Sequence, residues 1–430
     1  MRALLARFVP ALAPSERPKV TGPADPVMTA CVVALVAFGV VMVFSASAVF
    51  ADSRYDDPFH FFVRQSVFAL VGLAICFTVA RFDYHGYRRW TYPALAIAVF
   101  LLLAVVLGLG RAAGGAARWI AVGPINIQPA EAAKLALILW LAYSLSKKAE
   151  QIRSFEIGFL PHALVAGMLM LLCLKQPDFG SAVMIGMLTF VLLFTAGARL
   201  GYLLGAVMLA APVVYALIAF SPYRMKRIEA FLEPFEHRYG IGYQIAESLM
   251  SFGAGGATGV GIGDSRQKLL FLPEAHTDFI SAIVGEELGF VGISILLLAY
   301  VLLVFRGLRA AHQAADDYGA YLAIGITMFL GMQAFTNLAV AMGMLPTKGL
   351  VLPFMSYGGS SLLVNCAAVG ILLNVSRPRD VEELAEEAEA AEPKSTRKTR
   401  KQRAKTKGGS RGATRGRRKK RMNMRLEGAE

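Results

Sequence analysis

Apolar residues occur in long, nearly uninterrupted runs along most of the chain. A helix needs roughly twenty mainly apolar residues to cross a bilayer, because hydrocarbon offers the backbone no water to bond with. Ten stretches fit this pattern: 27–50, 64–80, 92–110, 130–146, 157–174, 180–198, 201–220, 279–305, 319–342 and 359–375. The pattern predicts an all-α polytopic membrane protein with about ten transmembrane helices.

The connections between these stretches differ in length and character. Most are short, but the segment 221–278, between the seventh and eighth predicted helices, is long and rich in proline, glycine and charged residues. Long connections in compact proteins are usually functional. We therefore expect a membrane domain at 27–375 with one large loop at about 221–278, preceded by a short segment, 1–26.

Composition agrees with this picture, since 56% of the residues are hydrophobic and only 17% are charged. The net charge of +14 resembles that of a nucleic-acid-binding protein. The position of the charged residues in the sequence leads to a different interpretation. From Lys394 to Arg425 the chain carries sixteen Lys and Arg, followed by Glu427 and Glu430. The excess charge therefore belongs to the segment 376–430, which is acidic, then basic, and is predicted to be a largely disordered tail. No nucleic-acid partner is expected.

Lysine and arginine also predict the orientation of the chain, because they favour cytoplasmic loops. They are frequent before the first predicted helix, in the second, fourth and eighth connections, and in the tail. This distribution predicts that both termini lie in the cytoplasm. The loop at 221–278 would then be extracytoplasmic, although the opposite loops are not free of cations.

A glycine-rich stretch, FGAGGATGVGIGDS, lies within the long loop and superficially resembles a phosphate-binding loop. It lacks the lysine and hydroxyl residue of a P-loop, does not fit G-x-G-x-x-G, and follows no predicted strand. Tight turns are the simpler interpretation. The sequence therefore gives no sign of a nucleotide-binding domain.

Charged residues recur at one end of the predicted helices. Glu131 and Lys134 share one face at the start of the fourth helix, where a structural ion pair and an anion-binding role for Lys134 are both consistent with the spacing. The predicted topology brings further charges to the same membrane face: Arg118, Lys175, Asp178, Asp278 and Lys348. Cations around one or two carboxylates suit an anionic lipid head group such as a pyrophosphate.

Asp278 ends the motif LPEAHTD immediately before the eighth helix, and its position has two explanations. Aspartate is favoured as a helix N-cap, so the carboxylate could be structural. It could also belong to the group of charges at this membrane face that suits an anionic head group. Ala282, Gly285 and Gly289 follow on one helix face, which either allows close helix packing or lines a groove.

Taken together, these motifs resemble the SEDS family (shape, elongation, division and sporulation) of bacterial membrane proteins. The resemblance covers about residues 27–375 and rests on these stretches: RWI at 118–120, QPAEAAK at 128–134, KQPDFGSA at 175–182, GYQIAESL at 242–249, GVGIGDSRQKLLFLPEAHTDF at 259–279, GEELGFVG at 285–292 and PTKGLVLPFMSYGGSS at 346–361. The loop sequence is more similar to the cell-division branch than to the elongation branch. Ala130 and Ser281 depart from the pattern, where serine and an aromatic residue are expected.

The resemblance implies a function: polymerisation of lipid II, the lipid-linked precursor of peptidoglycan, into glycan strands at the outer face of the cytoplasmic (inner) membrane. It implies that Asp278 is the catalytic residue. Substrate-binding residues are expected at Arg64, Arg118, Glu131, Lys134, Lys175, Gln176, Asp178, Gln244, His276, Lys348 and Ser356. The expected leaving group is a lipid pyrophosphate, so no nucleotide sugar is needed.

The resemblance also implies partners and a location. We expect a class B penicillin-binding protein transpeptidase, other membrane proteins of the division machinery, membrane lipids and a place at the division septum. No cofactor is certain, but a divalent cation, Mg²⁺ or Mn²⁺, could assist the pyrophosphate. The alternatives are a lipid II flippase or transporter, an elongation-type polymerase, and a non-enzymatic scaffold that recruits partners through its tail.

Overall fold

The computed structural model describes residues 20–113, 116–123, 125–268, 272–347 and 349–379. Gly22–Pro378 form one compact unit, and this unit contains the predicted membrane domain. The segments 1–19 and 380–430 lie outside the described residues, and with them the predicted basic tail.

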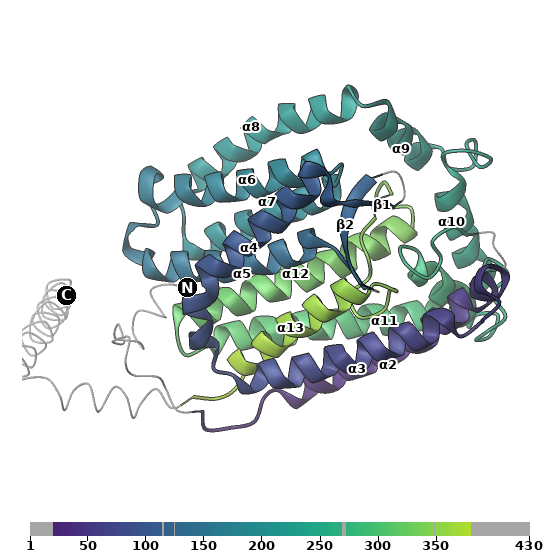
Figure 1. Cartoon of the computed structure of the whole chain (residues 1–430), viewed down its shortest axis with the longest axis horizontal. Helices are drawn as coiled ribbons and strands as arrows, with labels where there is room; N and C mark the ends of the chain where they lie inside the picture. Colours follow the sequence, from purple (N-terminus) through teal and green to yellow (C-terminus); the bar gives the residue numbers. More distant parts are fainter. Residues whose placement is uncertain (1–19, 114–115, 124, 269–271, 348, 380–430) are drawn as a thin grey trace, which may run out of the picture. The chain divides into compact units, whose positions relative to one another are not determined.

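All ten predicted stretches are helical in the structure (Figure 1). The helices are α2 (Pro26–Tyr55), α3 (His60–Arg81), α4 (Thr91–Ala104), α5 (Pro129–Lys147), α6 (Leu160–Lys175), α7 (Phe179–Ala196), α8 (Leu200–Ala219), α11 (Ile280–His312), α12 (Asp317–Ala341) and α13 (Gly359–Val375). Short helical turns extend some of them: η1 (Tyr84–Trp90), η2 (Val105–Leu109), η3 (Ala149–Gln151) and η4 (Phe155–Phe159). The all-α polytopic fold predicted from the sequence is confirmed.

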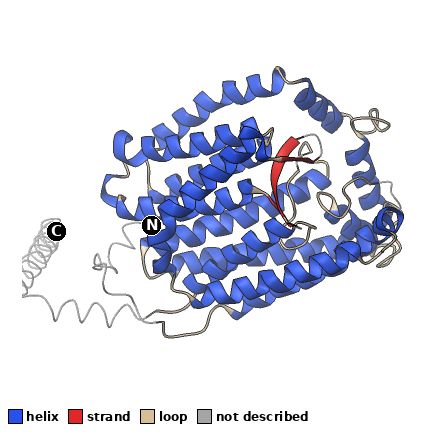
Figure 2. Cartoon of the chain, viewed as in Figure 1, coloured by secondary structure: helices blue, strands red, loops and turns tan. Residues whose placement is uncertain are grey.

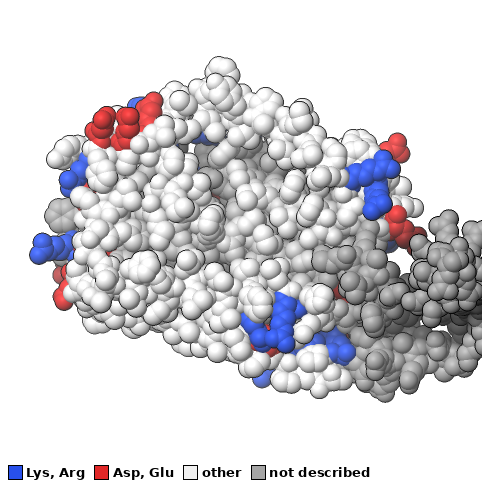
Figure 3. Space-filling model, turned by 180° about the vertical axis from the view of Figure 1, so that it is seen from behind, with Lys and Arg blue, Asp and Glu red and all other residues white. Residues whose placement is uncertain are grey.

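Within the described residues, eight helices are long and apolar enough to cross a membrane. α13 is a shorter apolar helix of 17 residues. α5 does not belong to either group, because it carries Glu131, Lys134 and Lys147, yet most of its residues are buried among the other helices. The back of the molecule has a broad uncharged area with Lys, Arg, Asp and Glu at its margins, as a membrane-embedded surface requires (Figure 3).

α8 is the exception in the bundle, since Leu203 is its only buried residue. It runs along the edge of the bundle and leads into α9 (Pro222–Leu232), and the chain continues to α10 (Tyr243–Gly255) (Figure 1). Both of these helices lie in the segment predicted as a long loop. That segment is therefore partly structured.

The structure adds a small sheet that the sequence analysis did not predict (Figure 2). Its antiparallel strands are β1 (Arg111–Ala113), β2 (Ala116–Val122) and β3 (Ile125–Ile127). The strands follow the end of α4 and precede α5. The sheet thus carries Arg118 on its central strand.

α11 is broken at Gly289, where φ is 63° and ψ is −160°. A break leaves backbone groups without partners, which is costly in a membrane. The glycine-rich stretch supplies them: Val260 and Gly261 donate to the carbonyls of Glu286 and Glu287, each at 3.0 Å. A Cβ at Gly259 would lie 2.1 Å from the Glu287 carbonyl oxygen, so only glycine fits there.

Ala282, Gly285 and Gly289 form a face of small residues on α11, and close approach of a neighbouring segment explains this face too. A Cβ at Gly255 of α10 would lie 1.9 Å from the carbonyl oxygen of Gly285, and a Cβ on Gly285 would collide with the ring of Phe252. The small residues therefore allow close packing between α10 and α11. The alternative interpretation, that this face lines a groove, is wrong at Gly285.

Candidate active site

Asp278 lies in the turn that precedes α11, and its carboxylate does not cap that helix. The N-cap residue is Phe279, and the cap makes no side-chain hydrogen bond. Among the described residues, no hydrogen bond to the Asp278 carboxylate is formed, while its backbone carbonyl accepts one from Asn337 at 2.8 Å. The N-cap explanation for Asp278 is therefore removed, and the half-buried carboxylate is available for chemistry.

Arg118 reaches the same place from strand β2. A Cβ built on Gly349 would lie 3.5 Å from Oδ2 of Asp278 and 3.8 Å from Nη1 of Arg118. The guanidinium is fixed from behind, because it donates to the backbone carbonyls of Gln176 and Pro177. Asp278 and one predicted cation thus converge at the turn that contains Gly349.

Arg227 is a second cation near Asp278, and sequence reasoning missed it. It lies on α9, and its Nη1 donates to the carbonyl of Thr347 at 2.9 Å, two residues before Gly349. The signal that could have found it is the pair Arg224 and Arg227, three residues apart and hence on one helix face, just after the seventh predicted helix.

The surroundings raise the pKa of the Asp278 carboxyl to about 7. Burial is the largest cause, and the charge of Glu274 adds to it, while Arg227 and Arg118 act in the opposite direction. A general base works best when its pKa lies near the operating pH. A pKa in this range would suit Asp278 to proton abstraction close to neutrality.

His276 is held in a cluster of aromatic rings from three other segments. Its ring centroid lies 4.8 Å from that of Phe61, and 5.7 Å from those of Phe50 and Tyr357. Its carbonyl accepts a hydrogen bond from the Tyr357 amide at 2.9 Å. Burial lowers the pKa of His276, although Glu274 opposes this, so the imidazole is neutral at pH 7. These contacts anchor the turn that carries Asp278.

Glu131 and Lys134 form a buried ion pair at 2.7 Å, with side-chain exposures of 2% and 0%. The Lys134 ammonium also lies 5.2 Å from the ring centroid of Phe329. One oxygen of Glu131, Oε2, has no hydrogen-bond partner within the described part of the chain. The ion-pair interpretation is thus confirmed, and the substrate-binding role of both residues stays a prediction.

Three other predicted site residues contact neighbouring groups of the protein in the structure, and their substrate-binding role stays a prediction. Asp178 caps α7, accepting from the amide and hydroxyl of Ser181. Gln176 donates to the Leu102 carbonyl at 2.8 Å, and the Ser356 hydroxyl accepts from the Leu352 amide at 2.8 Å.

The remaining predicted residues are not joined to Asp278. Arg64 on α3 and Lys175 at the end of α6 are exposed, and Gln244 on α10 is half-buried. Lys348 lies outside the described residues. For all of them, substrate binding stays a prediction.

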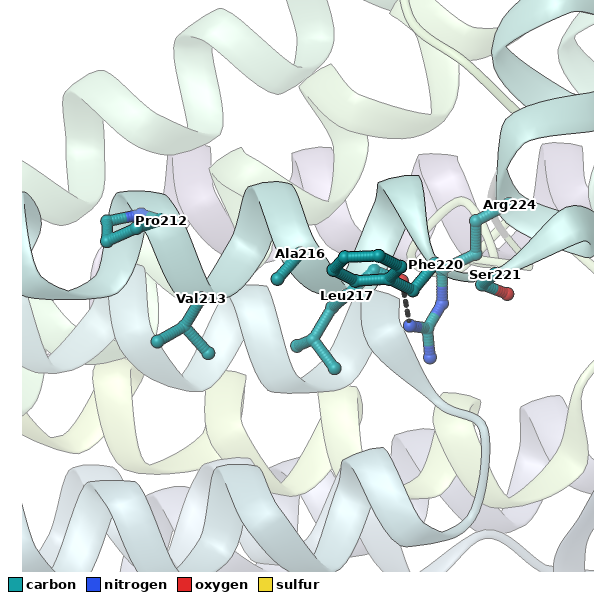
Figure 4. A pocket seen from close by; sticks show the side chains of 7 residues that line it. All are labelled: Pro212, Val213, Ala216, Leu217, Phe220, Ser221 and Arg224. Atoms are coloured by element: carbon teal, nitrogen blue, oxygen red, sulfur yellow. Dashed lines mark hydrogen bonds between the residues drawn. The ribbon is translucent and has the colours of Figure 1, made fainter.

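A groove of about 580 Å³ runs along α8 and the start of α9 (Figure 4). Its lining is apolar except at one end: Pro212, Val213, Ala216, Leu217, Phe220, Ser221 and Arg224. Arg224 donates to the Leu217 carbonyl at 2.6 Å and lies 5.5 Å from the ring centroid of Phe179. None of the residues around Asp278 lines this groove.

Metal binding by protein side chains alone is not supported in the described part of the chain. It contains no group of three His, Cys, Asp or Glu residues that could hold an ion. Glu274 and Asp278 supply carboxylate oxygens, the ligands that Mg²⁺ prefers. A divalent ion here would need further ligands, and the oxygens of a bound pyrophosphate are of the required kind.

Comparison with known proteins adds three findings. The family FTSW_RODA_SPOVE, described as cell cycle protein, matches residues 26–380. A protein of Trichlorobacter lovleyi named probable peptidoglycan glycosyltransferase FtsW is 48% identical over 82% of this chain and 93% of its own length. Stage V sporulation protein E of Bacillus subtilis is 43% identical over 80% of this chain and 94% of its own.

Two solved structures are similar in fold. One belongs to work described as structural coordination of polymerization and crosslinking by a peptidoglycan synthase complex, with a TM-score of 0.69 and 31% identity. The other is the rod shape determining protein RodA of Thermus thermophilus, with a TM-score of 0.61 and 30% identity. Each comparison covers 83% of this chain and 98% of the other chain.

Proposed function

The chain belongs to the FtsW/RodA/SpoVE family of cell cycle proteins, and we propose that it polymerises lipid II with Asp278 as the general base. It is a multi-pass membrane protein and a peptidoglycan glycosyltransferase of cell division. The relatives from Trichlorobacter lovleyi and Coxiella burnetii carry the name peptidoglycan glycosyltransferase FtsW, which favours this function over an elongation-type polymerase and over the flippase and scaffold alternatives.

The reaction joins two lipid-linked sugars. The C4 hydroxyl of GlcNAc on one lipid II attacks the anomeric carbon of MurNAc on the growing chain. A C–O bond forms there, the bond to the lipid pyrophosphate breaks, and the hydroxyl proton passes to the Asp278 carboxylate. Direct displacement inverts the carbon and gives a β linkage. A positioned base of this kind contributes roughly 10²–10⁴-fold to the rate.

The observation that carries this proposal is the setting of Asp278: a carboxyl with its pKa raised to about 7, and two arginines near it. The pyrophosphate gains negative charge as it leaves, so cations placed beforehand stabilise the transition state more than the ground state. Arg118 and Arg227 are the described residues suited to this role. Lys134 and Lys348 remain predicted contributors, and a divalent ion held by the pyrophosphate oxygens could add to them.

The partner and the location are finer parts of the proposal. The similar solved chain comes from a peptidoglycan synthase complex, which supports a penicillin-binding protein as the general kind of partner. We assign the class B transpeptidase to this role, together with other membrane proteins of the division machinery. The site would face the outside of the inner membrane at the septum, with both termini in the cytoplasm.

The test compares polymer made from lipid II by purified wild-type protein and by Asp278→Asn, each with the transpeptidase partner. Asparagine keeps the shape of the side chain but cannot accept the proton, so we expect no glycan polymer from this variant. Asp264→Asn, an exposed aspartate in the same long segment, is the matched control and should remain active. Equal polymer from wild type and a folded Asp278→Asn variant would overturn the assignment.

A further inference from the structure

Asn337 is a buried residue of α12 that joins the two segments meeting at the candidate active site. Its Nδ2 donates to the backbone carbonyl of Asp278 at 2.8 Å and to the backbone carbonyl of Leu350 at 2.7 Å. Leu350 directly follows Gly349, the residue that borders both Asp278 and Arg118. Both hydrogens of one amide group therefore connect the turn with the base to the turn beside it.

The orientation of this amide is determined by its neighbours. Carbonyl oxygens only accept hydrogen bonds, so the nitrogen of Asn337 must face Asp278 and Leu350. The opposite atom, Oδ1, accepts from the hydroxyl of Ser281 at 3.3 Å. Ser281 stands where the family resemblance leads us to expect an aromatic residue, and it supplies the hydroxyl that completes the arrangement.

The carboxylate of Asp278 has no such support of its own. Within the described residues it accepts no hydrogen bond, so its position depends on the backbone that carries it. On the aromatic side, His276 anchors the turn through ring contacts and the amide of Tyr357. On the α12 side, Asn337 holds the carbonyl of Asp278 itself. Asn337 is only 2% exposed and lies beneath the turn.

We propose that Asn337, with its amide oriented by Ser281, is a positioning residue that fixes Asp278 relative to the Gly349 turn and Arg118. The proposal rests on the assignment of Asp278 as the base. Reactive groups must be placed accurately, and a displacement of about 1 Å can lower the rate by about a hundredfold. Asn337 acts on the reaction through Asp278 and touches none of the reacting atoms.

The experiment uses the full-length protein with its transpeptidase partner and lipid II. Asn337→Asp keeps the size of the side chain but removes both donors. We expect kcat to fall by about a hundredfold while KM for lipid II changes by less than about twofold. The acid limb of the pH profile should also move, because the distances from Asp278 to Glu274 and Arg118 change and because the new carboxyl group lies beside Asp278. Ser281→Ala, which leaves the amide in place, should lower kcat less.

Asn374 provides a matched control at the opposite end of the bundle. It is 1% exposed, its Oδ1 accepts from the Tyr84 amide at 3.0 Å, and its Nδ2 donates to the Ala80 carbonyl at 2.9 Å. Asn374→Asp removes the same kind of bonds far from Asp278. It should lower the thermal midpoint without lowering kcat by more than about twofold and without moving the pH profile.

The outcomes separate the two proposals. Folded Asn337→Asp protein with the kcat and pH profile of wild type overturns the positioning role, as does an equal loss of kcat in Asn374→Asp. If Asn337→Asp does not fold, a folded Ser281→Ala variant with unchanged kcat overturns it instead. Asp278→Asn is measured alongside. If that variant polymerises normally, the general-base assignment fails, whereas an inactive Asp278→Asn beside a normal Asn337→Asp rejects the positioning role alone.

Discussion

The carboxylate of Asp278 and the guanidinium of Arg118 meet at Gly349: both lie within 4 Å of the point where a Cβ of that residue would stand. The three residues come from the turn before α11, from strand β2 and from the turn between α12 and α13. The exposed glycine leaves open the space where a base and a cation can reach one substrate.

The first prediction concerns that space. The backbone of Gly349 has no left-handed φ, and a Cβ there would make only ordinary van der Waals contacts, so Gly349→Ala should fold normally. Gly349→Leu should fill the gap and lower kcat/KM by on the order of a hundredfold, with Ala intermediate. Gly201→Ala on α8, where a Cβ meets nothing within 4 Å, is the control for polymerisation assays. Full activity of Gly349→Leu would show that substrate does not pass this turn.

The second prediction concerns Glu274, whose charge helps to raise the pKa of Asp278. If Asp278 is the general base, the ionised carboxylate is the active form, so polymerisation should increase with pH and reach half of its maximum near pH 7. Removing the charge in Glu274→Gln should lower the pKa of Asp278 and move this limb to lower pH. Glu233→Gln, an exposed glutamate elsewhere in the same long segment, should leave the limb in place. An unchanged limb in Glu274→Gln would contradict the electrostatic coupling.

The third prediction links the base to stability. The pKa of Asp278 is raised from 3.8 to about 7 in the folded protein, so between these values the folded state retains a proton that the unfolded state has lost. Folding stability therefore decreases as pH rises through this range. Asp278→Asn cannot ionise and should be more stable than wild type at pH 8, but not at pH 4. Thermal midpoints at both values test this, and a pH-independent difference would argue against the raised pKa.

Sequence patterns predicted the helices better than the site. Runs of apolar residues locate all ten helices because the bilayer imposes a minimum length, and α5 was found despite its charges. Asp278 and Arg118 were found because charged residues are conspicuous next to apolar runs. Arg227 was missed because it lies inside a long polar segment, where the pair that it forms with Arg224 does not stand out and does not show which of the two approaches Asp278. Which of these residues converge depends on tertiary contacts, such as those of Gly349, that no local pattern encodes.

The same limit applies to three other predicted site residues. Asp178, Gln176 and Ser356 carry polar groups next to the membrane helices, as Asp278 does, but their partners are backbone groups and a nearby hydroxyl. Spacing in the sequence does not predict those contacts, and the substrate-binding role of the three residues stays a prediction.

The fourth prediction concerns orientation. In a cysteine-free protein, single cysteines at Tyr239 and Asp264, both exposed in the long segment, should react with an impermeant thiol reagent in intact spheroplasts. A cysteine at Gln151, exposed in the fourth connection, should react only after permeabilisation. Gly255 is unsuitable for this test because a side chain there collides with α11. The reverse labelling pattern would put Asp278 in the cytoplasm and exclude the proposed reaction there.

The last prediction separates two arginines of one helix. Arg224 and Arg227 lie three residues apart on α9. Arg224 donates to the carbonyl of Leu217 and lies over the ring of Phe179. Arg227 donates to the carbonyl of Thr347, and its positive charge lowers the pKa of Asp278. If Arg227 stabilises the leaving pyrophosphate, Arg227→Gln should lower kcat by roughly 10²–10³-fold. It should also raise the pKa of Asp278 and move the acid limb to higher pH, because a neighbouring positive charge is lost.

Arg224→Gln removes the same charge one helical turn away, at the end of the groove along α8. It should leave the acid limb in place and lower kcat much less. The cations that lower the pKa of Asp278 are Arg227 and Arg118, and Arg224 is not among them. Arg227→Lys keeps the charge without the fork of donors, so it should restore the limb while recovering only part of kcat. Equal losses in the two glutamine variants, with no shift of the limb in either, would mean that α9 contributes only general positive charge and that Arg227 has no special place beside the base.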